Sequence, residues 1–262
     1  MESLVILGVL VIFMFFYVSF IFKDYGLSVK NYKGLLVPYS IGFIFVVLLS
    51  GDYLFTNYLV IDKYTYHYVF FIWLLGFIDD CFGSQFPKGI KGHFSILFRE
   101  KEVTTGLIKA VGVVAFSIYY LVMKTDMTPT SLLVFALLVL FPHTMNLLDT
   151  KPLRVWKITA VTTVVPFFLL SERDAFFIFL FLVVCMWAIF ESRMKAMLGD
   201  NGAMITGSVG AIVALQFNST FYTLCLVFFC VFITVVAEKI SIQSWLERTP
   251  VFRQIDQLGR KS

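Results

Sequence analysis

Long apolar stretches alternate with short polar segments along the whole chain. A helix needs about 20 apolar residues to cross the hydrocarbon core of a membrane, and nine stretches reach or approach that length. The pattern therefore predicts nine transmembrane helices, of which the third, sixth and eighth are short and depend on flanking residues, neighbouring helices or a thinner bilayer. We place the nine helices at residues 3–22, 34–50, 65–80, 104–123, 130–148, 158–171, 174–191, 202–217 and 219–237.

The residues after the ninth stretch have a different pattern. Ile242, Trp245 and Leu246 recur at helical spacing, which puts them on one face of a helix. Thr249 and Pro250 are typical of a helix N-cap and first turn, so they predict the start of a second short helix. We therefore expect an amphipathic tail that lies at the membrane interface.

The composition excludes an ordinary soluble domain. Hydrophobic residues make up 59% of the 262 residues and charged residues only 15%, whereas about a quarter of a soluble domain is charged. We predict an all-α, polytopic membrane protein with a transmembrane bundle at 1–240 and the tail at 241–262. The first apolar stretch is preceded by Glu2 and not by a basic segment, and it lacks a small-residue cleavage site, so we expect a retained helix and not a signal peptide. The four cysteines lack metal-ligand spacing and are expected to be free thiols.

The basic residues concentrate in every second loop. Of the 21 lysines and arginines, 18 fall on one side of the nine-helix arrangement, and only Lys63, Lys124 and Arg173 fall on the other. Because cytoplasmic loops are enriched in basic residues, we predict a plasma-membrane protein with its N-terminus outside and its tail in the cytoplasm. The net charge of +4 reflects this topology, and no nucleic-acid partner is expected.

Three helix ends on the predicted cytoplasmic side carry acidic or amide side chains. They hold Asp79 and Asp80, then Asn146 and Asp149, then Asp200. Ionisable groups at such positions are costly and are often functional. Four carboxylates in one pocket would repel one another unless a cation bound there, and hard oxygen ligands favour Mg²⁺, with Mn²⁺ as the alternative. We therefore predict one assembled pocket that holds a divalent ion.

Basic residues follow two of these acidic helix ends. Lys88 and Lys91 lie in the glycine-containing loop that runs from Cys81 to about Val103, which we predict to be a mobile binding loop, and Lys151 and Arg154 follow the second end. We assign these four cations, together with Arg99 in the same loop as Lys88 and Lys91, to phosphate binding. Carboxylates, a divalent ion and basic residues together indicate phosphoryl transfer, in which catalysis is mainly positioning and charge neutralisation.

Three motifs occur in a fixed order. They are Gly76-Phe77-Ile78-Asp79-Asp80-Cys81-Phe82-Gly83 followed by Lys88-Gly89-Ile90-Lys91-Gly92, then Asn146-Leu147-Leu148-Asp149, then Leu198-Gly199-Asp200-Asn201-Gly202-Ala203 with Gly207 and Gly210 beyond. Together they resemble the polyprenyl-phosphate N-acetylhexosamine-1-phosphate transferase superfamily, or glycosyltransferase family 4. That superfamily includes bacterial phospho-N-acetylmuramoyl-pentapeptide transferase and the enzymes that start teichoic-acid and O-antigen synthesis. The resemblance covers about two thirds of the chain, and three motifs in order are more specific than any one of them.

The resemblance implies transfer of a sugar-1-phosphate from a UDP-sugar to a polyprenyl phosphate such as undecaprenyl phosphate, with magnesium and with release of UMP. By position, Asp79 and Asp80 engage the lipid phosphate or the metal, and one of them is a candidate base. Positioning is expected to outweigh proton transfer, because a lipid phosphate is already ionised at neutral pH. The expected site comprises Asp79, Asp80, Asp149 and Asp200 for catalysis, Asp200 and Asp80 for the metal, and Asn146, Asn201, Lys88, Lys91, Lys151 and Arg154 for substrate binding.

The chain also departs from the superfamily pattern. Thr150-Lys151-Pro152-Leu153 stands where the superfamily continues with Gly-x-Asp-Gly, so that Pro152 replaces a second acid, and the His-rich loop and tenth span are missing. Two other functions stay open. One is a catalytically inactive relative that acts as a lipid-binding or scaffold protein. The other is an ion-coupled transporter, which the scarcity of ionisable residues midway along the helices disfavours. The sugar, the lipid acceptor and the formation of a homodimer are also left open.

Overall fold

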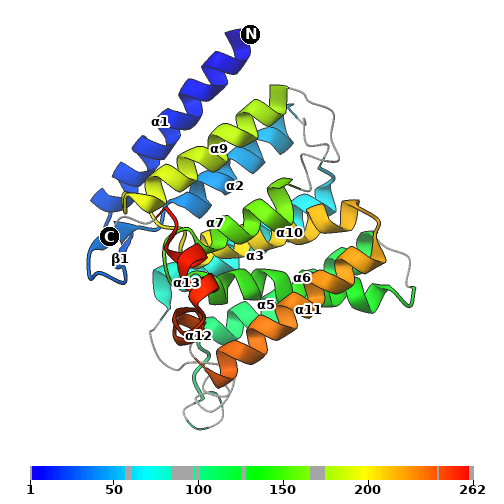
Figure 1. Cartoon of the computed structure of the whole chain (residues 1–262). Coiled ribbons are helices and arrows are strands. Elements are labelled where there is room, and N and C mark those ends of the chain that lie inside the picture. Colours follow the sequence, from blue (N-terminus) through cyan, green and yellow to red (C-terminus); the bar gives the residue numbers. More distant parts are fainter. Residues whose placement is uncertain are drawn as a thin grey trace.

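The computed structural model describes residues 2–56, 61–83, 97, 99, 101–124, 128–165, 175–240 and 242–259, and these are mainly helical (Figure 1). The predicted helical fold is therefore confirmed. The α-helices are α1 (Glu2–Asp24), α2 (Ile41–Gly51), α3 (Lys63–Phe82), α5 (Thr105–Lys124), α6 (Ser131–Leu148), α7 (Arg154–Thr159), α9 (Ala175–Ser192), α10 (Gly199–Gln216), α11 (Thr220–Lys239), α12 (Ile242–Arg248) and α13 (Pro250–Gln257). Two π-helical segments, η1 (Asp52–Thr56) and η2 (Ala160–Val164), continue α2 and α7.

A short β-hairpin precedes α2 in this mainly α-helical fold and corrects the predicted start of the second helix. Strand β1 (Ser28–Lys30) pairs antiparallel with β2 (Leu36–Pro38). The side-chain oxygen of Asn31 accepts hydrogen bonds of 2.9 and 3.0 Å from two backbone N–H groups of the turn, a local pattern that asparagine favours. Because Pro38 lacks an N–H and disfavours a helical residue before it, α2 begins at Ile41 and not at residue 34.

Helix α10 is the centre of the fold, and nearly all of its residues are buried. It packs against α2, α3 and α6 (Figure 1). These contacts require small residues: a Cβ on Gly207 would lie 2.4 Å from the Cα of Pro142 in α6, and a Cβ on Gly42 in α2 would lie 2.3 Å from the backbone nitrogen of Gly202. Glycine therefore lets the backbones of α10 and its neighbours approach closely, as in packed membrane helices.

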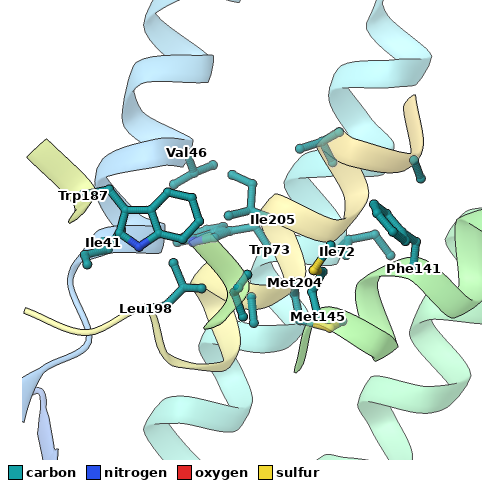
Figure 2. Close-up of a cluster of buried hydrophobic side chains, with 14 of the residues drawn as sticks. Ile41, Val46, Ile72, Trp73, Phe141, Met145, Trp187, Leu198, Met204 and Ile205 are labelled. Carbon is teal, nitrogen blue, oxygen red and sulfur yellow. The ribbon is translucent and has the colours of Figure 1, made fainter. Parts of the chain in front are cut away.

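Large apolar side chains from neighbouring helices fill the space around α10. Figure 2 shows Met204 and Ile205 of α10 close to Ile72 and Trp73 of α3. All four are buried, with exposed fractions between 0% and 6%. The other labelled members of this cluster are Ile41 and Val46 of α2, Phe141 and Met145 of α6, Trp187 of α9, and Leu198 just before α10. Burial of this apolar surface holds the ends of α3, α6 and α10 in place.

Three helices among the described residues are long and apolar enough to cross a membrane: α5, α6 and α11. Two shorter apolar helices cover Ile41–Phe55 and Leu180–Ser192. The outer face of α11 exposes large apolar side chains, including Phe221 at 75% and Phe228 at 69% exposure, which suits contact with lipid. Each of the nine predicted stretches contains a helix or part of one, but residues 166–171 of the sixth lie outside the described residues.

The tail forms two short helices, α12 and α13, as the sequence predicts. Thr249 is the N-cap residue of α13, and Pro250 is its first residue. A buried ion pair fastens α13 to the start of α7: Arg154 donates from Nε to Oδ1 of Asp256 at 2.7 Å and from a second guanidinium nitrogen to Oδ2 at 2.9 Å. A different face of α13 exposes Val251 at 63% and Ile255 at 48%, two residues that lie four positions apart. Nζ of Lys157 in α7 also donates to the backbone oxygens of Ile255 and Asp256, so the amphipathic tail is held by several polar contacts to α7.

Candidate functional site

The four predicted aspartates lie at the ends of three helices that meet at one end of the bundle. Asp79 and Asp80 are in the last turn of α3, Asp200 is in the first turn of α10, and Asp149 is the C-cap residue of α6. Each of the four aspartates interacts with another of the four, either through a hydrogen bond to its side chain or backbone or through a close electrostatic interaction. The structure thus brings together residues up to 121 positions apart, from all three sequence motifs.

Two glycines allow α10 to begin beside the end of α3. Gly76 faces the first turn of α10, where an added Cβ would lie 2.7 Å from the carbonyl oxygen of Asp200 and 2.8 Å from the Cα of Asn201. Gly199 has a φ of +68°, a conformation that glycine adopts without strain. These positions explain why the first and third motifs contain glycine next to their acidic residues.

Asp80 caps α10 from a different helix. Its Oδ1 accepts a hydrogen bond of 2.9 Å from the backbone N–H of Asp200, and its Oδ2 accepts one of 2.8 Å from the backbone N–H of Asn201. The residue at the N-cap position of α10, Leu198, has no polar side chain to do this. A carboxylate at a helix N-terminus satisfies free N–H groups and interacts favourably with the helix dipole. Asp80 therefore positions α10.

Asn201, a predicted substrate-binding residue, has a side chain that is occupied by protein contacts. Its side chain is fully buried, and its Nδ2 donates to Oδ2 of Asp80 at 2.6 Å and to the backbone oxygen of Tyr39 at 3.1 Å. Its Oδ1 accepts a hydrogen bond of 3.3 Å from Nε1 of Trp73. A buried amide needs such partners, so Asn201 joins α10 to α3 and to the segment before α2.

Lys109 lies between the predicted acidic residues, although the sequence did not lead us to assign it to the site. It lies in the second turn of α5 and reaches between α3 and α10. Its Nζ lies 2.5 Å from Oδ2 of Asp79 and is also bonded to Oδ2 of Asp200. The side chain of Lys109 is only 17% exposed. The signal was present in the sequence, because Lys109 is the one cation inside an otherwise apolar stretch between Thr105 and Met123.

Asn146 completes this group from α6. With its amide oriented to suit its neighbours, Nδ2 of Asn146 donates to Oδ1 of Asp200 at 3.0 Å and its Oδ1 accepts from Lys109 at 3.3 Å. Asp79, Asp200 and Asn146 therefore direct oxygen atoms from three helices at one ammonium group. The predicted metal pair was Asp80 with Asp200, but the two carboxylates that share a cation here are Asp79 and Asp200.

A small pocket adjoins Asp149. It is lined by the hairpin, the segment after α6 and the segment before α10, with the residues Asn31, Tyr32, Val37, Asp149, Thr150, Lys151, Pro152, Glu191, Met194, Ala196 and Met197. Burial raises the pKa of Asp149 well above its usual value, and the negative charge of Glu191 raises it further. Glu191 is itself buried and accepts a hydrogen bond of 2.6 Å from Nε1 of Trp187. A cation or a hydrogen-bond donor would be favoured here.

The cations that were predicted to bind phosphate differ in where they lie in the structure. Lys151 lines the pocket beside Asp149. Arg154 does not face it: its side chain is 4% exposed, and it is bonded to Asp256 and to Oγ1 of Thr150, because this guanidinium fastens the tail. Lys88 and Lys91 lie outside the described residues, as does most of the predicted binding loop.

The site has the donors that a hard divalent cation prefers. Within the part of the chain that the structure describes, no three acidic, histidine or cysteine side chains form a ready metal centre. Yet the ammonium group of Lys109 already stands between Asp79 and Asp200, and its three side-chain partners are oxygen atoms, the kind of ligand that Mg²⁺ and Mn²⁺ prefer. The chain matches no protein-family model, no curated protein and no solved structure.

Proposed function

We propose that this protein is a magnesium-dependent membrane phosphotransferase that moves a sugar-1-phosphate from a UDP-sugar to a polyprenyl phosphate and releases UMP, at the start of a cell-envelope glycan. The observation that carries the proposal is the convergence of Asp79, Asp80, Asp149 and Asp200 around Lys109 at one end of the bundle. Such a concentration of acids with one lysine suits a reaction between two anionic substrates and a divalent ion.

The proposed reaction joins two phosphates. An oxygen of the lipid phosphate attacks the phosphorus attached to the sugar, the bond from that phosphorus to the oxygen of the UMP phosphate breaks, and a lipid pyrophosphoryl sugar forms. UMP leaves with the bonding electrons. When bound, the divalent ion neutralises phosphate charge and orients the reacting oxygens. Asp79 and Asp200, with the amide oxygen of Asn146, are the residues that would hold it.

The remaining residues position these groups. Asp80 keeps the first turn of α10 against α3, which fixes the direction of Asp200. Asp149 and Lys151 border the small pocket at the end of α6, where they are the groups for contact with the nucleotide part of the donor. The proposal includes nine membrane crossings with the site on the cytoplasmic side, because UDP-sugars are cytosolic and the basic loops predict that side.

A second function is favoured by one observation. Lys109 already forms an ion pair with Asp79 and Asp200, so these carboxylates have a partner without any metal ion. A catalytically inactive relative that acts as a lipid-binding or scaffold protein would keep this pair as a structural link. The position of all four acids at the same end of the bundle opposes this second function, since a structural link needs only the ion pair of Lys109 with Asp79 and Asp200.

The test is release of UMP by the purified protein in detergent with magnesium, undecaprenyl phosphate and a panel of UDP-sugars. We expect release with at least one sugar, and only when both the lipid phosphate and magnesium are present. Asp200→Asn should lower the rate roughly 100-fold or more, as for removal of a group that stabilises transition-state charge. Asp62→Asn is the matched control, because Asp62 lies at the opposite end of α3.

The control should keep the wild-type rate, since asparagine is as good a helix N-cap as aspartate. Absence of UMP release with every sugar, from a protein that is folded and monodisperse, would contradict the transferase function and favour the scaffold function. Equal rates of UMP release by the wild type and Asp200→Asn would refute the assignment of Asp200 as a residue that holds the divalent ion, even if the protein were active.

A further inference from the structure

The ammonium group of Lys109, in the apolar helix α5, contacts oxygen atoms from three other helices. Its Nζ lies 2.5 Å from Oδ2 of Asp79, is bonded to Oδ2 of Asp200, and lies 3.3 Å from the amide oxygen of Asn146. The three oxygen atoms come from α3, α10 and α6, while the lysine comes from α5. One ammonium group therefore holds four helices together at the place where the acidic residues meet.

Further acidic side chains lie near Lys109. Asp80 and Asp149 add two more carboxyl groups to the two that the lysine contacts, and the Asp200 side chain is 35% exposed, so ions can reach the group. A divalent ion would bind here through the same oxygen atoms that now contact the ammonium. Two cations a few ångströms apart repel each other strongly, so the ion and the ammonium cannot share this position.

We infer that Lys109 is an exchangeable counter-ion: its ammonium group occupies the cation position between Asp79 and Asp200 in the metal-free protein and leaves that position when a divalent ion binds. The inference rests on the proposed function, in which a divalent ion binds at this site. A lysine suits this role, because its ammonium is a compact charge on a flexible chain of four carbons. Once released, it is within reach of a phosphate brought in by the substrate.

This inference differs from a purely structural ion pair in its effect on metal affinity. A structural lysine would keep the acidic groups in place, so its removal would weaken metal binding or leave it unchanged. A competing lysine must be displaced by the metal, so its removal strengthens binding. The same helix offers a matched control, since Lys124 at the far end of α5 pairs with Asp62 at 2.8 Å and lies away from the site.

The experiment is a titration of the purified full chain with Mn²⁺ alone, without substrates, followed by the loss of the electron paramagnetic resonance signal of free Mn²⁺. We expect Lys109→Met to bind Mn²⁺ about tenfold more tightly than the wild type or better, because each tenfold corresponds to about 1.4 kcal/mol of removed competition. Lys124→Met should bind like the wild type. Thermal unfolding should show a lower Tm for Lys109→Met without metal and a larger rise on addition of Mn²⁺.

A second variant covers the case in which Lys109→Met does not fold. Lys109→Arg keeps the charge and can form two parallel hydrogen bonds to a carboxylate, so it should fold and bind Mn²⁺ at least about threefold more weakly than the wild type. Equal or weaker binding by a folded Lys109→Met, or wild-type affinity of Lys109→Arg, would overturn the inference. UMP release is measured separately. If Lys109→Met binds Mn²⁺ more tightly but the wild type releases no UMP, only the transferase function is refuted. If the wild type releases UMP but Lys109→Met does not bind Mn²⁺ more tightly, only the counter-ion role of Lys109 is refuted.

Discussion

Replacement of Asp80 by asparagine tests whether this carboxylate holds the first turn of α10 against the end of α3. Asp80 accepts three hydrogen bonds, of 2.9, 2.8 and 2.6 Å, from two backbone N–H groups and the side chain of Asn201. Asparagine has nearly the same shape, but one oxygen becomes an NH₂ group that faces donors. At least one of the hydrogen bonds is then lost, together with the negative charge beside the helix N-terminus.

The expected cost follows from these contacts. A hydrogen bond to a charged group contributes roughly 1.5–3 kcal/mol, and a buried donor without a partner costs about 1–3 kcal/mol. For Asp80→Asn we therefore expect a loss of roughly 2–5 kcal/mol in the free energy of unfolding. In a chain of this size that lowers Tm by roughly 5–15 °C.

The neighbouring residue provides the control. Asp79 faces Lys109, which stays paired with Asp200 when Asp79 becomes asparagine. Asp79→Asn should therefore cost less than about 1.5 kcal/mol in stability, the range of an ordinary hydrogen bond, while it impairs metal binding and UMP release.

The assay is thermal unfolding of both variants in detergent, with hydrogen exchange of the first turn of α10 as a local readout. Faster exchange at Asp200 and Asn201 is expected only in Asp80→Asn. If both variants unfold within 2 °C of each other, or if α10 stays equally protected in both, the role of Asp80 as the cap of α10 is refuted.

Two further predictions concern other charged groups. The folded-state pKa of Asp149 is raised above its unfolded value, so the stability linked to this group is present at low pH and is lost as pH rises through the folded pKa. Asp149→Asn should therefore reduce the fall of Tm with rising pH, measured without divalent ions. An unchanged slope of Tm against pH would contradict the prediction. Asp256→Asn leaves the buried guanidinium of Arg154 without its charged partner and should lower the free energy of unfolding by about 3–5 kcal/mol. Asp62→Asn removes the exposed pair with Lys124 and should lower it by less than about 1 kcal/mol. Equal shifts in Tm for the two variants would refute the importance of burial.

The apolar pattern predicted the main helices because their length and composition are local properties of the chain. The ends of α3, α5, α6, α9 and α11 lie within two residues of the predicted ends. Strand β2 was predicted as the start of a helix because Leu35, Leu36 and Val37 are as apolar as the helix that follows, and Pro38 is the main signal that separates the two. Local turn chemistry, not hydrophobicity, decided the structure there.

The acidic residues of the site could also be recognised in the sequence, but their individual roles could not. Asp79 and Asp80 are neighbours, and consecutive residues of a helix point about 100° apart. One carboxylate therefore faces Lys109 while the other faces the first turn of α10. Which of the two does which depends on the rotation of α3 against its neighbours, and that is a property of the packed bundle.

The sequence by itself determined that the chain is helical and rich in apolar segments, and that acids stand at three helix ends, because these features depend on residues close together along the chain. Only the tertiary structure decided that Lys109 stands between Asp79 and Asp200 and that Arg154 binds Asp256. The partners in these ion pairs are 30, 91 and 102 residues apart, and they meet because glycines and apolar side chains fix how closely the helices approach.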